Sequence, residues 1–280
     1  MRYFRNRLPR AITVKSYAEA RTWLAHFAES NFHLVFLIGA PGLGKSQMAL
    51  QVLDQRRHAF IEGHATPLAF YQKLWEHRDE PVVIDDENSF VKHPGKLALM
   101  ACLCQSNPIK TLRWDSTAKY LEERGLPTQF RTASPVLIVT NQLRNLSAQV
   151  AALLDRGQPL FFEPSVDEIH REVADWFTDR EIYGFIGDWL PLIPDLSMRD
   201  YVKARNMKKA GMDWQELLKQ QWRCSKLARV LGLLNDTSFA TEEDRVRAFV
   251  GNGGSRATYF RNVARLKRLG VWPREKNVRP

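Results

Sequence analysis

One segment near the start of the chain restricts the possible folds more than any other. Residues 39–46, GAPGLGKS, match the pattern G-x-x-x-x-G-K-S/T and directly follow the apolar run Leu34 to Ile38. The next segment, Ser46 to Arg56, has the apolar spacing of a helix. A glycine-rich turn between a buried strand and a helix presents backbone N–H groups and a helix N-terminus to an anion. This order of elements therefore predicts a site for the phosphates of a nucleotide.

Two side chains of this loop have specific predicted roles. Lys45 is placed to reach the β- and γ-phosphates, and the hydroxyl of Ser46 is placed to bind Mg²⁺. A chance glycine turn is the alternative, and the flanking strand and helix argue against it. The predicted nucleotide-binding residues of the loop are Gly39, Ala40, Pro41, Gly42, Leu43, Gly44, Lys45 and Ser46.

The surrounding sequence alternates between strand-like and helix-like segments. His58 to Ile61, Pro81 to Ile84 and Pro135 to Thr140 are short runs suited to buried strands, and amphipathic stretches such as Pro67 to His77 lie between them. This alternation predicts an α/β fold with a parallel sheet. From Val166 onward helical spacing dominates, so the second half is expected to be mostly α-helical.

Three carboxylates end the strand predicted at residues 81–84. Asp85 can hold Mg²⁺ through water, and a following carboxylate can polarise the attacking water. Asp86 is the first choice for that base, and Glu87 is the alternative. A buried strand that merely ends in an acidic turn is the other interpretation.

Two further polar residues follow predicted elements of the sheet. Asn141 comes directly after the strand PVLIVT, where its amide can orient the attacking water. Arg156 follows an apolar helix and precedes the strand Pro159 to Phe162, where it can reach the γ-phosphate of a neighbouring subunit as an arginine finger. Each also has a structural interpretation, a turn cap for Asn141 and a surface ion pair for Arg156.

The ordered motifs GAPGLGKS, VVIDDE, VTN and LLDRG resemble those of the AAA+ ATPases over residues 34–162, with a helical lid beyond them. Within that superfamily the chain resembles replication-associated and phage or plasmid ATP-binding proteins, including initiators, helicase loaders and superfamily 3 helicases. The resemblance implies a P-loop ATPase that uses ATP and Mg²⁺. The family's Asp-Glu pair is Asp-Asp-Glu here, which leaves the choice of base open.

The same resemblance implies roles for individual residues. Asp85 and Asp86 would serve Mg²⁺ binding and hydrolysis, and Asn141 would be sensor 1. Arg156 would be the finger, and Arg199, in LSMRDYVKA, would reach the nucleotide from the lid as sensor 2.

The net charge of +10 is distributed unevenly along the chain. Residues 201–280 hold 18 basic and 7 acidic residues, and residues 1–20 hold 5 and 1, so the part between them is mildly acidic. A strongly basic C-terminal quarter suggests a module that binds a polyanion.

Within that quarter the pattern resembles a helix-turn-helix. A short helix over Thr241 to Gly251 is followed by a glycine turn, and Ser255 is a suitable N-cap for a second helix. On the second helix Tyr259, Val263 and Leu266 share one face, with Phe260 and Ala264 beside them, and arginines recur on another face. Such a helix would enter the DNA major groove, and a lid helix with a solvated basic face is the alternative. The predicted DNA contacts are Arg256, Thr258, Arg261, Asn262, Arg265 and Arg268.

The predicted domains are a basic N-terminal segment and helix (1–32), an AAA+ core (33–164), a helical lid (165–210) and a basic DNA-binding module (211–280). Since no uncharged apolar run approaches 18 residues, no membrane span is expected. Three cysteines, Cys102, Cys104 and Cys224, cannot form a disulfide framework and are read as reduced thiols. A cytoplasmic location is expected, because the basic N-terminus lacks the features of a secretory signal.

The leading functional hypothesis is a DNA-binding ATPase that assembles with copies of itself as a ring or filament, for example a hexamer. It would serve replication initiation, helicase loading or remodelling, with a helicase or transposase as a protein partner. The alternative is an ATP-dependent switch that recruits a protein partner in transposition or phage defence. A small-molecule kinase is disfavoured, because the carboxylate strand and the separate polar strand tip suit the activation of water.

Overall fold

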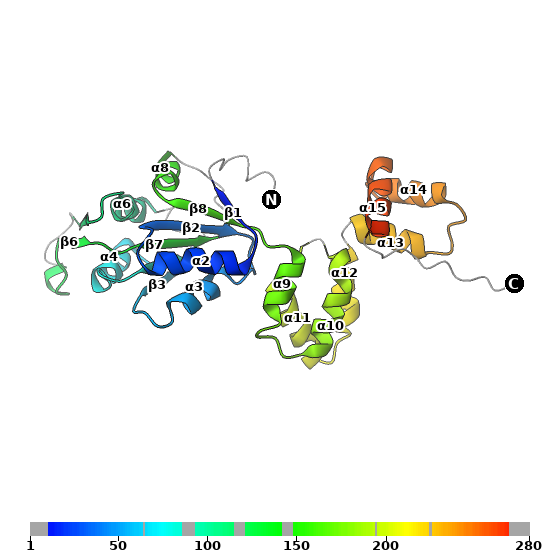
Figure 1. The fold of residues 1–280 in the computed structure, drawn as a ribbon, viewed down its shortest axis with the longest axis horizontal. Coiled ribbons are helices and arrows are strands. Elements are labelled where there is room, and N and C mark those ends of the chain that lie inside the picture. The colour runs from blue at the N-terminus through cyan, green and yellow to red at the C-terminus, as the bar shows by residue number, and fades with distance from the viewer. Residues whose placement is uncertain are drawn as a thin grey trace. The chain divides into compact units, whose positions relative to one another are not determined.

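The chain divides into two compact units, Met1–Ser165 and Val166–Pro280, and each is described by itself (Figure 1). The computed structural model describes residues 11–63, 65–85, 93–114, 121–141, 148–193, 195–223 and 226–268. Among these residues no helix is both long enough and apolar enough to pass through a bilayer.

The first unit is built on a six-stranded sheet in the order β1-β8-β2-β7-β4-β3. Every neighbouring pair in it is parallel. All residues of β2 are buried, as expected for a central strand covered on both faces. The strands are β1 (Ile12–Val14), β2 (Leu34–Gly39), β3 (Ala59–Glu62), β4 (Val82–Asp85), β7 (Val136–Thr140) and β8 (Gln158–Phe162).

Helices cover both faces of this sheet (Figure 1). Helices α4, α6 and α8 share a core with alternate residues of β2, namely Leu34, Phe36 and Ile38. Helices α2 and α3 contact each other and lie on the opposite face in Figure 1. The predicted α/β fold with a parallel sheet is therefore confirmed. The helices are α2 (Tyr17–Ala28), α3 (Lys45–Leu53), α4 (Pro67–Glu76), α6 (Pro94–Leu103) and α8 (Ala148–Arg156).

Two features of this unit were not predicted from the sequence. Strand β1 pairs with β8 at the edge of the sheet, so the segment before α2 belongs to the core. An antiparallel pair, β5 (Lys110–Arg113) and β6 (Gln129–Thr132), lies between β4 and β7 in the chain. Each strand of the pair has only four residues, which is too short to give a clear period-2 pattern.

The described elements of the second unit are all helical, as predicted. Two of its helices begin with a complete capping box, formed by Ser197 with Asp200 in α11 and by Thr241 with Asp244 in α14. The elements are α9 (Val166–Val173), α10 (Arg180–Trp189), η1 (Leu190–Leu192), α11 (Met198–Lys209), α12 (Trp214–Arg223), α13 (Lys226–Asn235), α14 (Glu242–Gly251) and α15 (Arg256–Arg268).

Helices α13, α14 and α15 pack around a small apolar core that includes Phe249 and Tyr259. The turn between α14 and α15 requires glycine at two positions. Gly253 has a φ of +79°, and a Cβ atom on Gly254 would lie 2.3 Å from the ring of Phe249. The Thr258 N–H donates to Ser255 Oγ over 3.3 Å, so Ser255 caps α15. The turn therefore lets the two helices approach closely.

Candidate nucleotide site and basic helix

The phosphate-binding loop leaves the end of β2 at a position that only glycine can occupy. A Cβ atom on Gly39 would lie 2.6 Å from the carbonyl oxygen of Phe162, in the neighbouring strand β8. Gly42 and Gly44 have φ angles of +78° and +73°, the left-handed region that favours glycine. Between them Leu43 is buried. The spacing of glycines in the motif is thus explained by backbone geometry.

The helix that follows the loop begins without a side-chain cap. Gly44 occupies the N-cap position of α3, and no side chain among the described residues caps it. The first N–H groups of a helix lack intrahelical acceptors, and the helix dipole adds positive potential there. This N-terminus therefore fits the phosphate group that the motif implies.

Lys45 joins the loop to another strand. Its side chain is 5% exposed, and its Nζ donates to Gly39 O (3.0 Å), Ala40 O (2.8 Å) and Asn141 Oδ1 (2.9 Å). Asn141 follows the end of β7, which pairs with β2 on one side and with β4 on the other. The structure thus brings together two residues that are far apart in the sequence and that were predicted separately.

Asp85 lies at the same edge of the sheet. It ends β4 and is paired in register with Val139, close to the tip of β7. Carboxyl ends of parallel strands meet at one edge, which is where ligands of open α/β sheets bind. The two candidate bases, Asp86 and Glu87, lie outside the described residues.

The oxygen atoms of Ser46 and Asp85 suit Mg²⁺. Mg²⁺ in phosphate sites is typically held by one or two protein oxygens together with substrate phosphates and water. Among the described residues there is no cluster of three or more His, Cys, Asp or Glu side chains that could hold a metal alone. The hydroxyl of Ser46 and the carboxylate of Asp85 fit an ion that enters with a nucleotide.

Arg156 lies at the opposite edge of the sheet. It ends α8 just before β8, and the first residue of β8, Gln158, is in register with Val35 at the start of β2. The length of β2 separates that edge from Gly39 by roughly 15 Å. Arg156 is exposed, and its Nη1 donates to Ala101 O over 3.2 Å. It therefore lies too far away to contact the phosphates of a nucleotide held by its own loop.

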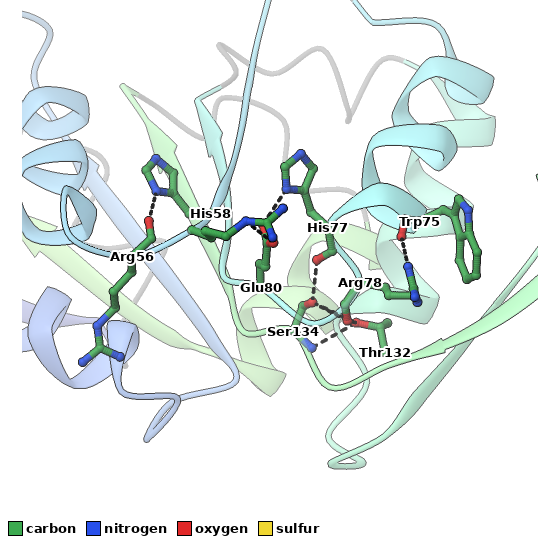
Figure 2. A network of polar contacts seen from close by, with 9 residues as sticks. Arg56, His58, Trp75, His77, Arg78, Glu80, Thr132 and Ser134 are labelled. Carbon is green, nitrogen blue, oxygen red and sulfur yellow. Dashed lines mark hydrogen bonds and ion pairs between the residues drawn. The ribbon is translucent and has the colours of Figure 1, made fainter.

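The amino edge of the sheet also holds a polar network (Figure 2). Thr132 Oγ1 donates to Arg78 O over 2.6 Å, and Ser134 Oγ lies 2.9 Å from the same oxygen. His77 Nδ1 and Glu80 Oε2 are 2.6 Å apart. Lys110, which is buried, donates from Nζ to Ser134 O over 2.7 Å. These bonds tie the start of β4 to the β5–β6 pair and the start of β7.

The thiols near this edge are free, as expected for Cys102 and Cys104. Burial raises the pKa of Cys104 to about 12, so its thiol stays protonated at neutral pH. Cys224 lies outside the described residues.

Arg199, the proposed sensor 2, belongs to the second unit. It is exposed at the start of α11, and its backbone N–H donates to Ser197 Oγ over 3.0 Å. Its role toward a nucleotide remains a prediction.

The basic helix α15 buries the residues predicted for its core. Tyr259, Val263 and Leu266 are all buried. Phe260 and Ala264, which the sequence placed beside them, are exposed instead, and Phe260 is 40% exposed. The reason is that each residue turns the helix by about 100°, so both side chains fall outside the narrow face that packs on α13 and α14.

Two of the predicted DNA contacts, Arg256 and Thr258, have partners within the module. Arg256 Nη1 lies 2.5 Å from Glu243 Oε1, and its guanidinium is 5.4 Å from the centre of the Phe260 ring. Thr258 is half-buried, and its N–H donates to Ser255 Oγ. Asn262 is half-buried, and its Nδ2 atom has no hydrogen-bond partner among the described residues. The other predicted contacts, Arg261, Arg265 and Arg268, are exposed on one face together with Ala257 and Ala264.

The strand order, the uncapped helix after the loop and the bond from Lys45 to Asn141 define the class of this core. It is a P-loop NTPase fold, and it resembles the AAA+ ATPases as the motifs predicted.

The chain is distantly similar to several known proteins. No protein-family model matches it. An uncharacterized 36.7 kDa protein of the nrdC-mobD intergenic region of enterobacteria phage T4 is 25% identical over 138 residues, which cover 46% of this chain and 40% of the phage protein. The similarity therefore spans less than half of either protein.

Several solved structures are also similar. A variant of Thermotoga maritima RuvB has a TM-score of 0.43 at 14% identity, covering 92% of this chain and 91% of that one. A DNA replication initiation factor has a TM-score of 0.42 at 12% identity, covering 77% of this chain and 66% of that one. A Walker-type ATPase of Pyrococcus abyssi has a TM-score of 0.39 at 12% identity, covering 94% and 92%.

Proposed function

We propose that this chain is an ATPase that binds ATP with Mg²⁺ at the loop of residues 39–46 and acts on DNA as an assembly of identical copies. The observation that supports it most directly is the 2.9 Å bond from Lys45 Nζ to Asn141 Oδ1. That bond joins the loop to the end of β7, which lies between β2 and β4. The terminal phosphate of a nucleotide held by the loop would therefore contact both the Lys45 ammonium and the Asn141 amide.

The residues at this edge would divide the work of hydrolysis. Lys45 would bind the β- and γ-phosphates, while Ser46 and Asp85 would hold Mg²⁺, which supplies charge neutralisation when bound. Asn141 would orient the attacking water. Asp86 would polarise it, with Glu87 as the alternative base.

The position of Arg156 supports an assembly. An arginine at the amino edge, roughly 15 Å along the strands from its own loop, can stabilise a γ-phosphate only in another copy of the chain. A ring or filament in which each copy contributes its Arg156 to the next would meet this requirement. Arg199 would complete the site from the helical lid as sensor 2.

The exposed face of α15 supports the DNA-binding part of the proposal. Arg261, Arg265 and Arg268 are separated by the small side chains of Ala257 and Ala264, so the helix backbone could approach a groove while the guanidinium groups contact phosphates. Arg256 contacts Glu243, Thr258 contacts Ser255, and Asn262 is half-buried, so direct base contacts by these three are a minor part of the proposal.

One experiment tests the main proposal. ATP turnover is measured without DNA, with single-stranded DNA and with duplex DNA, and particle mass is measured in ATP and in ADP. Stimulation by DNA and a larger mass in ATP are expected. Turnover that DNA leaves unchanged, combined with nucleotide-dependent capture of another protein, would instead favour the regulatory switch, and phosphate transfer to a metabolite would favour a kinase.

A second experiment tests the basic helix. Arg261→Glu with Arg265→Glu should weaken duplex binding and flatten its dependence on salt, because fewer counterions are released. Lys203→Glu with Lys209→Glu on α11 makes the same change in net charge and is the matched control. Equal losses in the two double variants would mean that net charge, rather than α15, determines binding.

A further inference from the structure

A buried tyrosine outside the nucleotide motif contacts the phosphate-binding loop. Tyr17 is the first residue of α2 and is 2% exposed. Its hydroxyl donates to the carbonyl oxygen of Leu43 over 3.0 Å, across 26 residues of sequence. No motif predicted this contact, because the two segments meet only in the folded unit.

The tyrosine is itself held in place by β8. Its ring meets the ring of Phe162 edge to face, with centroids 5.0 Å apart and an interplanar angle of 84°. The backbone oxygen of Phe162 is also the atom that a Cβ on Gly39 would approach to 2.6 Å. Phe162 therefore lies against Gly39 at the start of the loop. It also packs against Tyr17, whose hydroxyl bonds to Leu43 in the middle of the loop.

The accepted hydrogen bond determines which way a peptide group points. In a planar trans peptide the carbonyl oxygen and the following N–H point in opposite directions. With Leu43 O turned toward Tyr17 in the core, the Gly44 N–H is turned away from the core. Gly44 also precedes the uncapped first turn of α3, where an anion is favoured.

The bond also restricts a segment that would otherwise be mobile. Leu43 lies between two glycines in the left-handed region, Gly42 and Gly44, and glycine has more backbone freedom than any other residue. Ordering such a segment before binding removes a cost that binding would otherwise carry.

We propose that Tyr17 is a positioning residue, which holds Leu43 O so that the loop is ordered for the phosphates of a nucleotide before the nucleotide arrives. This inference rests on the proposed nucleotide binding and goes beyond it, because it assigns a role to a residue outside every nucleotide motif of the chain. Tyr17 acts through the loop and does not touch the ligand itself.

The test compares two tyrosines in the full chain. Tyr17→Phe removes only the hydroxyl, and Tyr71→Phe is the matched control, because Tyr71 is also buried and donates its hydroxyl to a backbone oxygen, Pro127 O, over 2.9 Å. Each loses one hydrogen bond of similar strength, so similar small losses of thermal stability are expected. Dissociation constants are then measured for ADP with Mg²⁺ and for AMP.

We expect the dissociation constant of ADP to rise about fivefold to tenfold in Tyr17→Phe and to stay unchanged in Tyr71→Phe. AMP, which lacks the β-phosphate, should be affected less. Hydrogen exchange at residues 42–46 should be faster in Tyr17→Phe without ligand, and this measurement does not depend on turnover.

Three results would count against the inference. ADP affinity in Tyr17→Phe equal to that of the wild-type chain would remove the positioning role while leaving the nucleotide site intact. Equal losses in both variants would indicate a general loosening of the unit. Failure of the wild-type chain to bind ADP at all would overturn the proposed function, and the inference with it.

Discussion

At the carboxyl edge of the sheet, Lys45, Asp85 and Asn141 gather beside a helix that begins without a cap. At the amino edge, by contrast, the buried side chains of Thr132 and Ser134 bond to one another and to a backbone oxygen, Arg78 O. Figure 2 shows the hydrogen bonds that connect Thr132 and Ser134 with the backbone of residues 77 and 78 at the amino edge. At the carboxyl edge, the backbone N–H groups of the uncapped helix can bind a ligand. At the amino edge, the polar groups bond within the fold.

This difference distinguishes the candidate binding site at one edge of the sheet from the structural contacts at the other. A buried hydroxyl that bonds to protein oxygens contributes to stability, because its loss leaves an unsatisfied acceptor. A helix N-terminus without a cap contributes little to stability and instead offers donors to an anion. We therefore expect substitutions at the carboxyl edge to alter nucleotide chemistry and most substitutions at the amino edge to alter folding.

Arg156 is the predicted exception at the amino edge, and it carries the largest expected effect. Arg156→Ala should lower ATP turnover by about 10³-fold or more while leaving nucleotide affinity unchanged, because an arginine supplied in trans stabilises only the transition state. Turnover and ADP affinity are measured at concentrations where copies associate. Mixing the variant with a Lys45→Ala chain should restore some activity, and normal turnover by Arg156→Ala alone would rule out the finger.

Lys45→Ala should come next in magnitude. Loss of the ammonium that meets the phosphates should lower turnover by about 10²- to 10³-fold and weaken ATP binding. Lys73→Ala is the control, because Lys73 is an exposed residue of α4. Lys45→Ala also leaves three oxygens without this donor and should unfold at a lower temperature, whereas Lys73→Ala should unfold like the wild-type chain. Turnover by Lys45→Ala close to the wild-type value, measured well below its unfolding temperature, would contradict the phosphate role of Lys45.

Thr132→Val should destabilise the first unit by about 1–3 kcal/mol without changing nucleotide affinity, because it leaves Arg78 O without this donor. Thr111→Val is the matched control, since Thr111 is exposed on the paired strand directly opposite Arg131, and a change within about 0.5 kcal/mol is expected there. Urea unfolding measures both. A change in ADP affinity in Thr132→Val would show that the two edges are coupled.

The smallest effect concerns pH. The hydrogen bond with His77 is the main cause that lowers the pKa of Glu80, with smaller contributions from nearby cations. Because the folded-state pKa lies below the unfolded one, Glu80 stabilises the fold above its unfolded pKa, and this contribution disappears as pH falls through the folded-state value. Glu80→Gln should therefore cost at most about 1 kcal/mol at pH 7 and less at about pH 3, with the remainder lost as pH falls through the folded-state pKa.

Urea unfolding at both pH values checks this prediction. Asp79→Asn is the control. The Asp79 side chain is largely exposed, and its ion pair with Arg78 Nε is long, at 3.7 Å, so its removal should have little effect at either pH. A loss that does not change with pH would show that the Glu80 carboxylate acts through packing rather than charge.

Much of the carboxyl edge could be predicted from the sequence, because its parts are local. A buried strand, a glycine loop and a helix are contiguous, and the ends of parallel strands meet at one edge whatever their distance in sequence. That is why Asp85 and Asn141 could be placed near the loop in advance.

The other features depend on tertiary contacts, which produce no periodic pattern in the sequence. Tyr17 reaches Leu43 across a tertiary contact, and the network around Thr132 forms between loops that resemble any other polar turns. The exposure of Phe260 could not be predicted, because apolar character alone does not determine how wide the packed face of a helix is. The paired strands β5 and β6 were missed because four residues carry too little pattern.

The bonds of Lys45 have a consequence for how nucleotide affinity should be understood. An ammonium group carries three hydrogens, and Lys45 already meets three oxygen atoms. An incoming phosphate oxygen can then gain a bond only as one of these is released, so the measured affinity is the free energy of an exchange. Two of the oxygens belong to the loop backbone, and the third belongs to the rotatable amide of Asn141. Release of the amide would break the bond that joins the loop to the residue after β7, so filling the loop would change the contacts at that end of the strand.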